Sequence, residues 1–278
     1  MNAEHSSPTD LRTHLGSPDR FGYSWAIYHA ILPEHREQFL RWTAALPAEA
    51  WRGARFLDAG CGIGRNSYWA MQAGAAGGVA FDIDERSLAA ARENLKACPA
   101  VEVRHHSIYD PLARDAFDIV FSIGVIHHLD APDAAIRQMV RAAKPGGRVM
   151  IWVYGRENMG WLVRYFDPIR RTLFSRLPLG AVYRLSLYPS LLLWLALRLG
   201  LARLEYYRLL RRLSFVHLRA IVFDQMIPRV AHYWPREVAA GLLRDAGLEE
   251  INVVHVNEMS WSVAGRKAHE LWKYVRRS

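Results

Sequence analysis

Hydrophobic and polar positions follow two different periods along this chain. Between residues 55 and 155, short apolar runs typical of buried strands alternate with longer segments that have helical spacing. This alternation predicts βαβ units and a parallel sheet. The expected strands are "RFLDA", "GGVAFDID", "VEVRHHS", "FDIVFSIG" and "GRVMIWVYG", and the expected helices are "RNSYWAMQAG", "ERSLAAARENLKA" and "APDAAIRQMVRAAKPGG", the last of which ends in a Pro-Gly-Gly stop signal.

The alternation stops after Gly155. About eighty residues rich in Leu, Arg, Trp and Tyr follow, and they read mostly as helix. A helix and two strands then return in "PREVAAGLLRDAGLEEINVVHV" and "MSWSVAGRKA". We therefore predict an α/β fold: a doubly wound, mostly parallel seven-stranded sheet with an α-helical insertion before the last strands. The predicted division is an N-terminal tail with lid helices at 1–50, the α/β domain at 51–155 and 235–278, and the insertion at 156–234.

Composition narrows the class of protein. The 278 residues are 51% hydrophobic and 23% charged, as in ordinary globular proteins. Two cysteines, Cys61 and Cys98, are too few for a disulfide framework, so a reducing, cytoplasmic location is expected. The polar start of the chain predicts no secretory leader. No set of His, Cys, Asp or Glu has metal-ligand spacing, so no metal is expected.

The net charge of +9 is concentrated in one place. Between Trp161 and Val222 there are eleven arginines, no lysine and two acids, and the rest of the chain is balanced. Arginine without lysine suits recognition of a carboxylate or phosphate. The excess charge is therefore a local property of the insertion.

The sequence leaves open what the insertion contacts. Its apolar run Leu185–Leu197 is shorter than the ~20 residues of a bilayer span and contains Pro189, so no transmembrane helix is predicted. Residues 199–213 have the pattern of a basic amphipathic helix. Three interpretations remain: a cap packed on the domain or on a second subunit, a face for a membrane surface, and a face for RNA.

Glycines mark a candidate ligand loop in "FLDAGCGIGRN", where Gly60, Gly62 and Gly64 follow the first strand. The first strand-to-helix turn of such a sheet commonly contacts a ligand, and glycine lets the backbone approach it. Asp82 ends the second strand, where a carboxylate accepts hydrogen bonds from ribose hydroxyls. Because Arg65 stands where a dinucleotide fingerprint has its third glycine, and no G-K-[ST] follows, NAD and ATP are disfavoured.

These motifs carry a family resemblance. "FLDAGCGIGRN" and "GVAFDID" resemble the first two motifs of the class I S-adenosylmethionine-dependent methyltransferases, and "FDIVFSIGVIHHLDAP" and "AKPGG" resemble later ones. The likeness runs over 55–154 and returns over 235–263, and it implies a Rossmann-like methyltransferase fold with S-adenosylmethionine as cofactor. Ser107 stands where members commonly place an acid near the adenine. The cofactor-binding residues that the resemblance implies are Asp58, Ala59, Gly60, Cys61, Gly62, Asp82, Ile83, Ser107, Ile108, Ile123 and Gly124.

Two histidines are the candidates for chemistry at the transfer point. His127 and His128 follow the fourth strand, and a histidine suits proton removal if the acceptor must lose a proton. A structural role is the competing interpretation, since histidines here are common in the family. His128 is the better candidate for a place near the cofactor. The expected acceptor pocket consists of Tyr23, Trp25, Tyr28 and Tyr154.

The sequence thus predicts an S-adenosylmethionine-dependent methyltransferase for a small or lipid-like acceptor, methylated on oxygen, nitrogen or carbon. One alternative is an RNA methyltransferase that uses the basic insertion, although nucleic acid is not the expected partner. The other is a cofactor-binding or scaffold protein without turnover. Peripheral membrane contact or homo-oligomer formation through 156–234 stays open.

Overall fold

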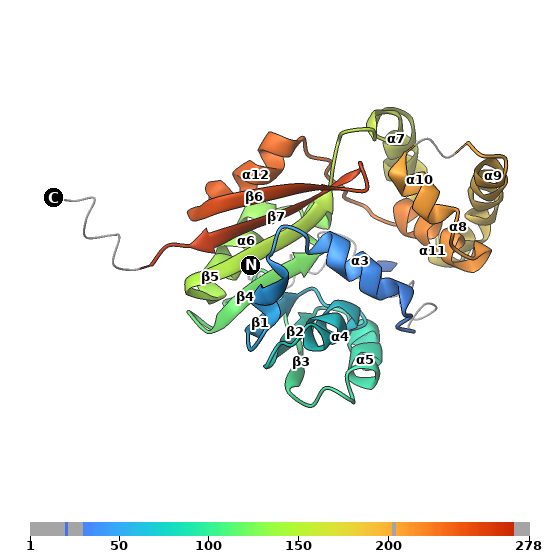
Figure 1. Cartoon of the computed structure of the whole chain (residues 1–278). Helices are drawn as coiled ribbons and strands as arrows, with labels where there is room; N and C mark the ends of the chain where they lie inside the picture. The colour runs from blue at the N-terminus through green and yellow to red at the C-terminus, as the bar shows by residue number, and fades with distance from the viewer. Residues whose placement is uncertain (1–19, 22–29, 202–203, 270–278) are drawn as a thin grey trace, which may run out of the picture.

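A seven-stranded sheet forms the centre of the protein, with the strand order β3-β2-β1-β4-β5-β7-β6 (Figure 1). The computed structural model describes residues 20–21, 30–201 and 204–269. The first five strands of this order, β3, β2, β1, β4 and β5, are parallel, and β7 is antiparallel to both of its neighbours. The predicted fold class is confirmed. The strands are β1 (Arg55–Ala59), β2 (Gly77–Asp82), β3 (Val101–His105), β4 (Phe117–Ile123), β5 (Ala143–Tyr154), β6 (Leu248–Val256) and β7 (Ser260–Lys267).

The central strands form where the sequence is apolar on both sides, because helices cover both faces of the sheet. Leu57 of β1 pairs with Val79 of β2 and Val120 of β4, and all three are at most 4% exposed. One face packs against α3 (Glu34–Trp42), α4 (Arg65–Gln72) and α5 (Glu85–Asn94). The other packs against α6 (Pro132–Ala142) and α12 (Arg236–Arg244) (Figure 1).

The segment between β5 and α12 is helical and stands to one side of the sheet (Figure 1). Val182, Phe223, Met226 and Ile227 form a small core of its own. Among the described residues its elements are the π-helices η3 (Leu162–Phe166) and η4 (Arg170–Phe174) around α7 (Asp167–Ile169), then α8 (Leu179–Leu185), α9 (Leu187–Arg198), α10 (Glu205–Leu210) and α11 (Phe215–Met226).

Polar contacts fasten this insertion to the α/β domain. Arg41 of α3 donates to Glu205 at 2.6 Å, and the backbone N–H of Glu205 donates to Glu258 at 2.6 Å. On the side of the sheet, Gln225 donates to the Tyr154 hydroxyl at 2.8 Å. The position of the insertion relative to the sheet is therefore fixed by specific hydrogen bonds at the ends of the strands.

Three local expectations were wrong. Pro189 does not end the helix: the Ser186 N–H donates to the Val182 carbonyl and the Ser190 N–H to the Ser186 carbonyl, so hydrogen bonding continues from α8 into α9. The helix expected over 199–213 is broken, since Gly200 adopts a left-handed φ of 84° after α9 and α10 begins only at Glu205. The Pro-Gly-Gly turn lies inside β5, where the pairing of β4 with β5 shifts register.

The joined helix has the dimensions of a membrane span. Leu179–Arg198 is 20 residues long and is the one helix of the described chain that is long and apolar enough to cross a bilayer by length and composition. Within that stretch only Val182, Ser186, Ser190 and Leu197 are buried inside the protein.

Candidate functional site

The glycine loop after β1 is folded onto the end of β2. Gly60, Gly62 and Gly64 have φ values of 81°, 53° and 77°, a region that side chains other than glycine rarely adopt. The N–H groups of Gly60 and Cys61 both donate to the Phe81 carbonyl at 2.9 Å. The Gly62 N–H donates to Asp82 Oδ2 at 2.9 Å, so the first three N–H groups of the loop are internally bonded.

Close packing explains two of the glycines. A Cβ on Gly60 would lie 2.5 Å from Cγ2 of Val125, which follows β4. A Cβ on Gly64 would lie 2.9 Å from Cδ1 of Leu95, at the end of α5. The loop therefore fills the gap at the point where the strand order reverses between β1 and β4.

Asp82 presents a carboxylate at this switch point. Its Oδ1 accepts from the Asp84 N–H at 3.0 Å and its Oδ2 from Gly62, which leaves each oxygen with further accepting capacity. Burial raises the pKa of Asp82, and the backbone N–H donors oppose that shift. Because the N–H groups of Gly60, Cys61 and Gly62 are already bonded, these three do not form the open anion nest that a nucleotide phosphate needs.

Asp58 lies beneath the loop and is fully buried. Ser67 donates its hydroxyl to Asp58 Oδ2 at 2.7 Å, while Oδ1 is buried without a partner. Burial raises the pKa of Asp58 to about 7, and the nearby Asp82 charge adds to the shift. One carboxylate oxygen therefore retains its full hydrogen-bonding capacity below the glycine loop.

This pKa predicts a pH-dependent stability. From about pH 4 to about pH 7 the unfolded chain has released the Asp58 proton that the folded chain still holds, so the free energy of unfolding falls as the pH rises. We expect the stability of the wild type relative to Asp58→Asn to fall by at most about 4 kcal/mol across that window. Urea titrations at several pH values measure it, and the comparison cancels the histidines, whose lowered pKa values act in the opposite direction. A stability difference that stays constant from pH 4 to 7 would contradict the assignment.

The other cofactor-binding residues that the sequence predicts surround the same strand ends. Ser122 donates its hydroxyl to the Ala59 carbonyl at 2.7 Å, which joins the ends of β1 and β4. Next come Ile123, which is buried, and Gly124, whose N–H donates to the Trp152 carbonyl at 3.2 Å. Ile83 follows Asp82, and its carbonyl contacts His105 at 3.0 Å.

Ser107 and Ile108 follow β3, beside the Asp82 edge. The N–H of the preceding His106 donates to the Asp82 carbonyl at 3.0 Å. Ser107 is half-buried, and its hydroxyl accepts from the Tyr109 N–H at 3.3 Å, so it stabilises the turn after β3. Ile108 is buried in the core cluster.

The structure separates the two candidate histidines. His128 shares a hydrogen bond between Nδ1 and the Val230 carbonyl at 2.8 Å, and burial lowers its pKa to about 3. His127 is fully buried, both of its ring nitrogens are unpartnered, and burial lowers its pKa well below the usual value. Its ring centroid lies 3.8 Å from that of Tyr154. His127 therefore has free hydrogen-bonding capacity, whereas one nitrogen of His128 is bonded to the backbone.

Tyr154, at the end of β5, is the centre of a polar cluster. Its ring stacks on Tyr233 with centroids 5.4 Å apart, and its hydroxyl accepts from Gln225. The Tyr233 hydroxyl and Gln225 Oε1 are buried without partners. Burial raises the pKa of Tyr154 well above its usual value and that of Tyr233 to about 12, so both phenols stay protonated.

Arg170 adds a buried positive charge to this cluster. It is fully buried and paired with Asp167, but its Nε and Nη1 have no partner. Its charge contributes to the lowered pKa of His127 and of His128, so it lies within electrostatic reach of both. We call His127, Tyr154, Gln225, Tyr233 and Arg170 the polar cluster.

Sequence reasoning found only part of this site. It missed Arg170, Gln225 and Tyr233. A polar Asp-Gln pair near the end of the mostly apolar α11 was an available signal for Gln225, but nothing distinguishes Arg170 among eleven arginines. The predicted pocket residues Tyr23, Trp25 and Tyr28 lie outside the described residues.

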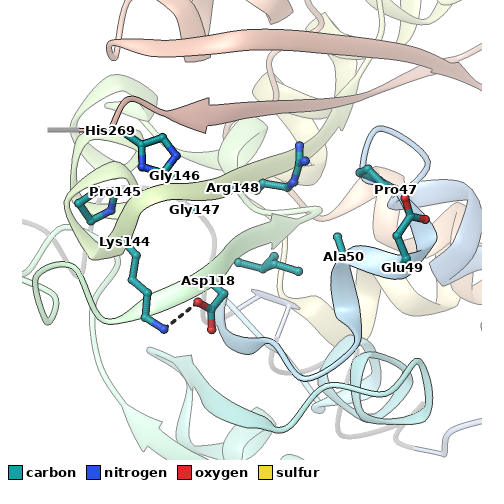
Figure 2. Close-up of a pocket in the computed structure, with 11 residues that line it drawn as sticks. Pro47, Glu49, Ala50, Asp118, Lys144, Pro145, Gly146, Gly147, Arg148 and His269 are labelled. Atoms are coloured by element: carbon teal, nitrogen blue, oxygen red, sulfur yellow. Dashed lines mark hydrogen bonds and ion pairs between the residues drawn. The ribbon is translucent and has the colours of Figure 1, made fainter. Parts of the chain in front are cut away.

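A separate pocket lies at the opposite end of the strands. Figure 2 shows its lining, with Lys144 bonded to Asp118 at 2.7 Å, His269 beside Gly146, and Pro47 and Glu49 on the opposite side. Asp118 also accepts from the N–H of Arg55 at the start of β1, which places this pocket at the amino ends of the strands. Open sheets of this kind bind ligands at the carboxyl ends, so the glycine loop and the polar cluster are the candidate site.

Comparison with known proteins identifies the central segment. Residues 57–151 match a family model described as a methyltransferase domain. The chain is 33% identical over 137 residues to the ubiquinone biosynthesis O-methyltransferase of Bordetella avium, covering 48% of this chain and 54% of that protein. It is 32% identical over 127 residues to the malonyl-[acyl-carrier protein] O-methyltransferase of Pectobacterium atrosepticum, covering 46% and 48%. The chain spans about half the length of these two relatives.

Solved structures share the fold at low identity. A 1,6-didemethyltoxoflavin-N1-methyltransferase from Burkholderia thailandensis aligns with a TM-score of 0.53 and 16% identity, covering 96% of this chain and 93% of that one. Human N-acetylserotonin methyltransferase, solved with S-adenosylmethionine, aligns with a TM-score of 0.51 and 14% identity, covering 83% and 52%.

Proposed function

We propose that the chain, whose residues 57–151 match a methyltransferase domain, is a class I S-adenosylmethionine-dependent methyltransferase that transfers a methyl group to a small or lipid-like acceptor on oxygen, nitrogen or carbon. The observation that carries this proposal is the polar cluster, which places unpaired hydrogen-bonding groups beside the strand ends that hold the glycine loop. Buried polar atoms are normally paired, so such a group of unpaired ones marks a place for a ligand. The acceptor would bind between β5 and the insertion.

The residues at the switch point fit S-adenosylmethionine. Asp82 has accepting capacity for ribose hydroxyls, and Asp58 Oδ1 offers an unpaired carboxylate oxygen toward the amino-acid part. The absence of an open anion nest in this loop fits a cofactor without phosphates. When bound, the cofactor supplies a methyl group on a sulfonium, a carbon already activated for displacement. The contribution of the chain is then mainly orientation, worth roughly 7–11 kcal/mol in well-aligned systems.

Among the histidines, we assign contact with the acceptor to His127. It is neutral, buried and unpaired, so one ring nitrogen can accept a hydrogen bond from an acceptor hydroxyl or amine. The neighbouring ring of Tyr154, inclined at 35° to the His127 ring, holds its orientation. His128, bonded to the Val230 carbonyl, has a positioning role that joins the turn after β4 to the segment before α12.

The chemistry of Arg170 favours an acceptor with an anionic group. Asp167 is paired with both Arg170 and Arg171, which leaves the three side chains with a net positive charge. A carboxylate or phosphate on the acceptor would pair with the unused N–H groups of Arg170 and satisfy their hydrogen-bonding capacity.

Two measurements test this function in order. Calorimetric titration with S-adenosylmethionine and S-adenosylhomocysteine, with NAD as control, is expected to show micromolar binding of the first two and none of NAD. Cell extracts incubated with the chain and methyl-labelled cofactor are then expected to yield a labelled small product that is retained on anion-exchange resin at neutral pH.

The outcomes separate the alternatives. Cofactor binding with no labelled product in any extract would favour a non-catalytic role. Label recovered in RNA would favour an RNA methyltransferase. A labelled product that passes through the resin would contradict the role of Arg170 and leave the methyltransferase assignment intact.

A further inference from the structure

Exposed apolar side chains are concentrated on the helical insertion. Of the fifteen large hydrophobic side chains that are exposed in the described residues, thirteen lie within residues 161–216. A soluble monomer rarely exposes its apolar residues together, and such patches mark contact surfaces. The insertion therefore has a surface that the rest of the chain does not cover.

Helix α9 shows how this surface arises. Its inner side, with Ser190 and Leu197, packs within the insertion against α11 and α10. The outer side has the helical spacing i, i+3, i+4, i+7 and i+11. Helix α9 itself lies at the far right of Figure 1. We call these outer residues the apolar stripe: Tyr188, Leu191, Leu192, Leu195 and Leu199, which are 44–80% exposed.

A second row of exposed apolar residues precedes it. Along the helical stretch from Trp161 to the end of η4, the large apolar side chains that are exposed recur every four positions. This is the spacing of neighbours on one side of a helix. The row consists of Trp161, Tyr165, Ile169 and Leu173, each about half exposed.

Unbalanced positive charge accompanies both rows. The two acids between 161 and 222 are already paired, Glu205 with Arg41 and Asp167 with Arg170 and Arg171. Arg184 precedes the apolar stripe by one turn, and Arg198 lies at its end, next to Leu199, with its guanidinium 5.0 Å from the Trp194 ring. Seven exposed arginines of the insertion form no ion pair within the described part of the chain: Arg164, Arg176, Arg184, Arg198, Arg208, Arg211 and Arg212.

We propose that the insertion binds the surface of an anionic lipid bilayer, with the apolar stripe entering the headgroup boundary and the surrounding arginines contacting lipid phosphates. Apolar area and positive charge on one surface are what interfacial binding requires. This proposal goes beyond methyl transfer and is tested without it.

Charge and side-chain type favour lipid over the other occupants. A second copy would bring two strongly positive insertions together, and like charges oppose that contact. RNA binding uses stacking on aromatic rings, whereas the stripe is mostly leucine. A bilayer span would place Arg184 in the apolar core at a high cost. It would also break the contacts of Arg219 with the Tyr183 carbonyl and Ser186 that join α8–α9 to α11.

Sedimentation of the full chain with lipid vesicles tests the proposal. We expect binding to phosphatidylcholine vesicles that contain phosphatidylglycerol, little binding to phosphatidylcholine alone, and release in ~1 M salt, where the Debye length falls to about 3 Å. Tyr188→Ser with Leu192→Ser is expected to weaken binding by about tenfold or more. Arg184→Gln with Arg198→Gln is expected to weaken it by about tenfold or more, since each arginine near the surface contributes ~1 kcal/mol.

Matched controls use the same changes elsewhere. Leu40→Ser with Val238→Ser alters two exposed apolar residues outside the insertion, and Arg36→Gln with Arg137→Gln alters two exposed arginines. Both pairs are expected to bind vesicles as the wild type does, and melting temperatures confirm that every variant is folded.

Four results would overturn the proposal. The first is no sedimentation with phosphatidylglycerol vesicles. The second is a wild-type dimer in sedimentation velocity that the stripe variants convert to monomer while vesicle binding is unchanged. The third is RNA oligonucleotide binding that the arginine variants weaken while vesicle binding is unchanged. Retention on vesicles after an alkaline wash would indicate a span instead of a surface contact.

Discussion

Replacing Gly60 with alanine is expected to abolish measurable binding of S-adenosylmethionine. The new Cβ would lie 2.5 Å from Val125, and the backbone at φ 81° disfavours any side chain. Left-handed strain costs about 1–2 kcal/mol and overpacking about 1–3 kcal/mol, so the loop is expected to move instead of accepting both. Because the Gly60 and Cys61 N–H groups bond the Phe81 carbonyl, a shifted loop also loses its register with β2. Calorimetric titration measures the loss of affinity.

Alanine replacements at two other glycines separate the effect of backbone strain from that of the clash with Val125. Gly53 has a φ of 69° and no atom within 4 Å of a Cβ, so Gly53→Ala tests backbone strain without the clash. Gly160 has neither a positive φ nor a close neighbour, so Gly160→Ala shows the effect of a glycine-to-alanine replacement without strain or clash. Both variants are expected to bind the cofactor as the wild type does, with a loss of stability only in Gly53→Ala. Wild-type affinity in Gly60→Ala would refute the site assignment.

The second large effect is expected for Asp82→Asn. Oδ1 and Oδ2 each accept from a backbone N–H, so either orientation of the amide directs its NH₂ at a donor, Asp84 or Gly62. Hydrogen bonds to charged groups contribute about 1.5–3 kcal/mol each, so losing the bond to the ribose predicts affinity about 10- to 100-fold weaker. The decrease should be seen for S-adenosylmethionine and S-adenosylhomocysteine alike, because both contain the ribose.

Asp84→Asn is the matched control two residues away. Asp84 caps α5 by accepting from the N–H groups of Arg86 and Ser87, and asparagine is an equally good cap. Its cofactor affinity is expected to stay within about twofold of the wild type, since the Asp84 carboxylate is bonded to the first turn of α5 and to the Arg86 side chain and not to the glycine loop. Equal affinities of Asp82→Asn and Asp84→Asn would show that Asp82 does not contact the cofactor.

Much of the cofactor side of the site could be predicted from the sequence. The strand "GGVAFD" and the loop after "RFLDA" are local patterns, and adjacent parallel strands bring their carboxyl ends together. That geometry makes proximity of Gly62 and Asp82 predictable, and the structure confirms a direct hydrogen bond. The sequence did not predict that the N–H groups of Gly60 and Cys61 would be bonded internally, because their partner belongs to another strand.

The acceptor side was largely hidden from sequence reasoning. His127 was a candidate from its place after β4, but its neighbours Tyr154 and Tyr233 are 27 and 106 residues further along the chain. Local patterns do not specify contacts at such separations, which depend on how the insertion returns to the sheet. Gln225 and Arg170 became candidates only because their buried atoms lack partners.

The sequence by itself determined the sheet, its covering helices and the glycine loop, because two-sided burial and left-handed backbone positions leave local signatures. The tertiary structure decided which polar groups are paired and which apolar surface is exposed to solvent. Helix α9 is apolar on both sides, so its composition did not indicate which side would be covered. Packing of α11 against one side buries Leu197 and leaves Leu192 exposed to solvent. That choice depends on the three-dimensional path of the chain, since burial is a property of neighbours and not of the residue.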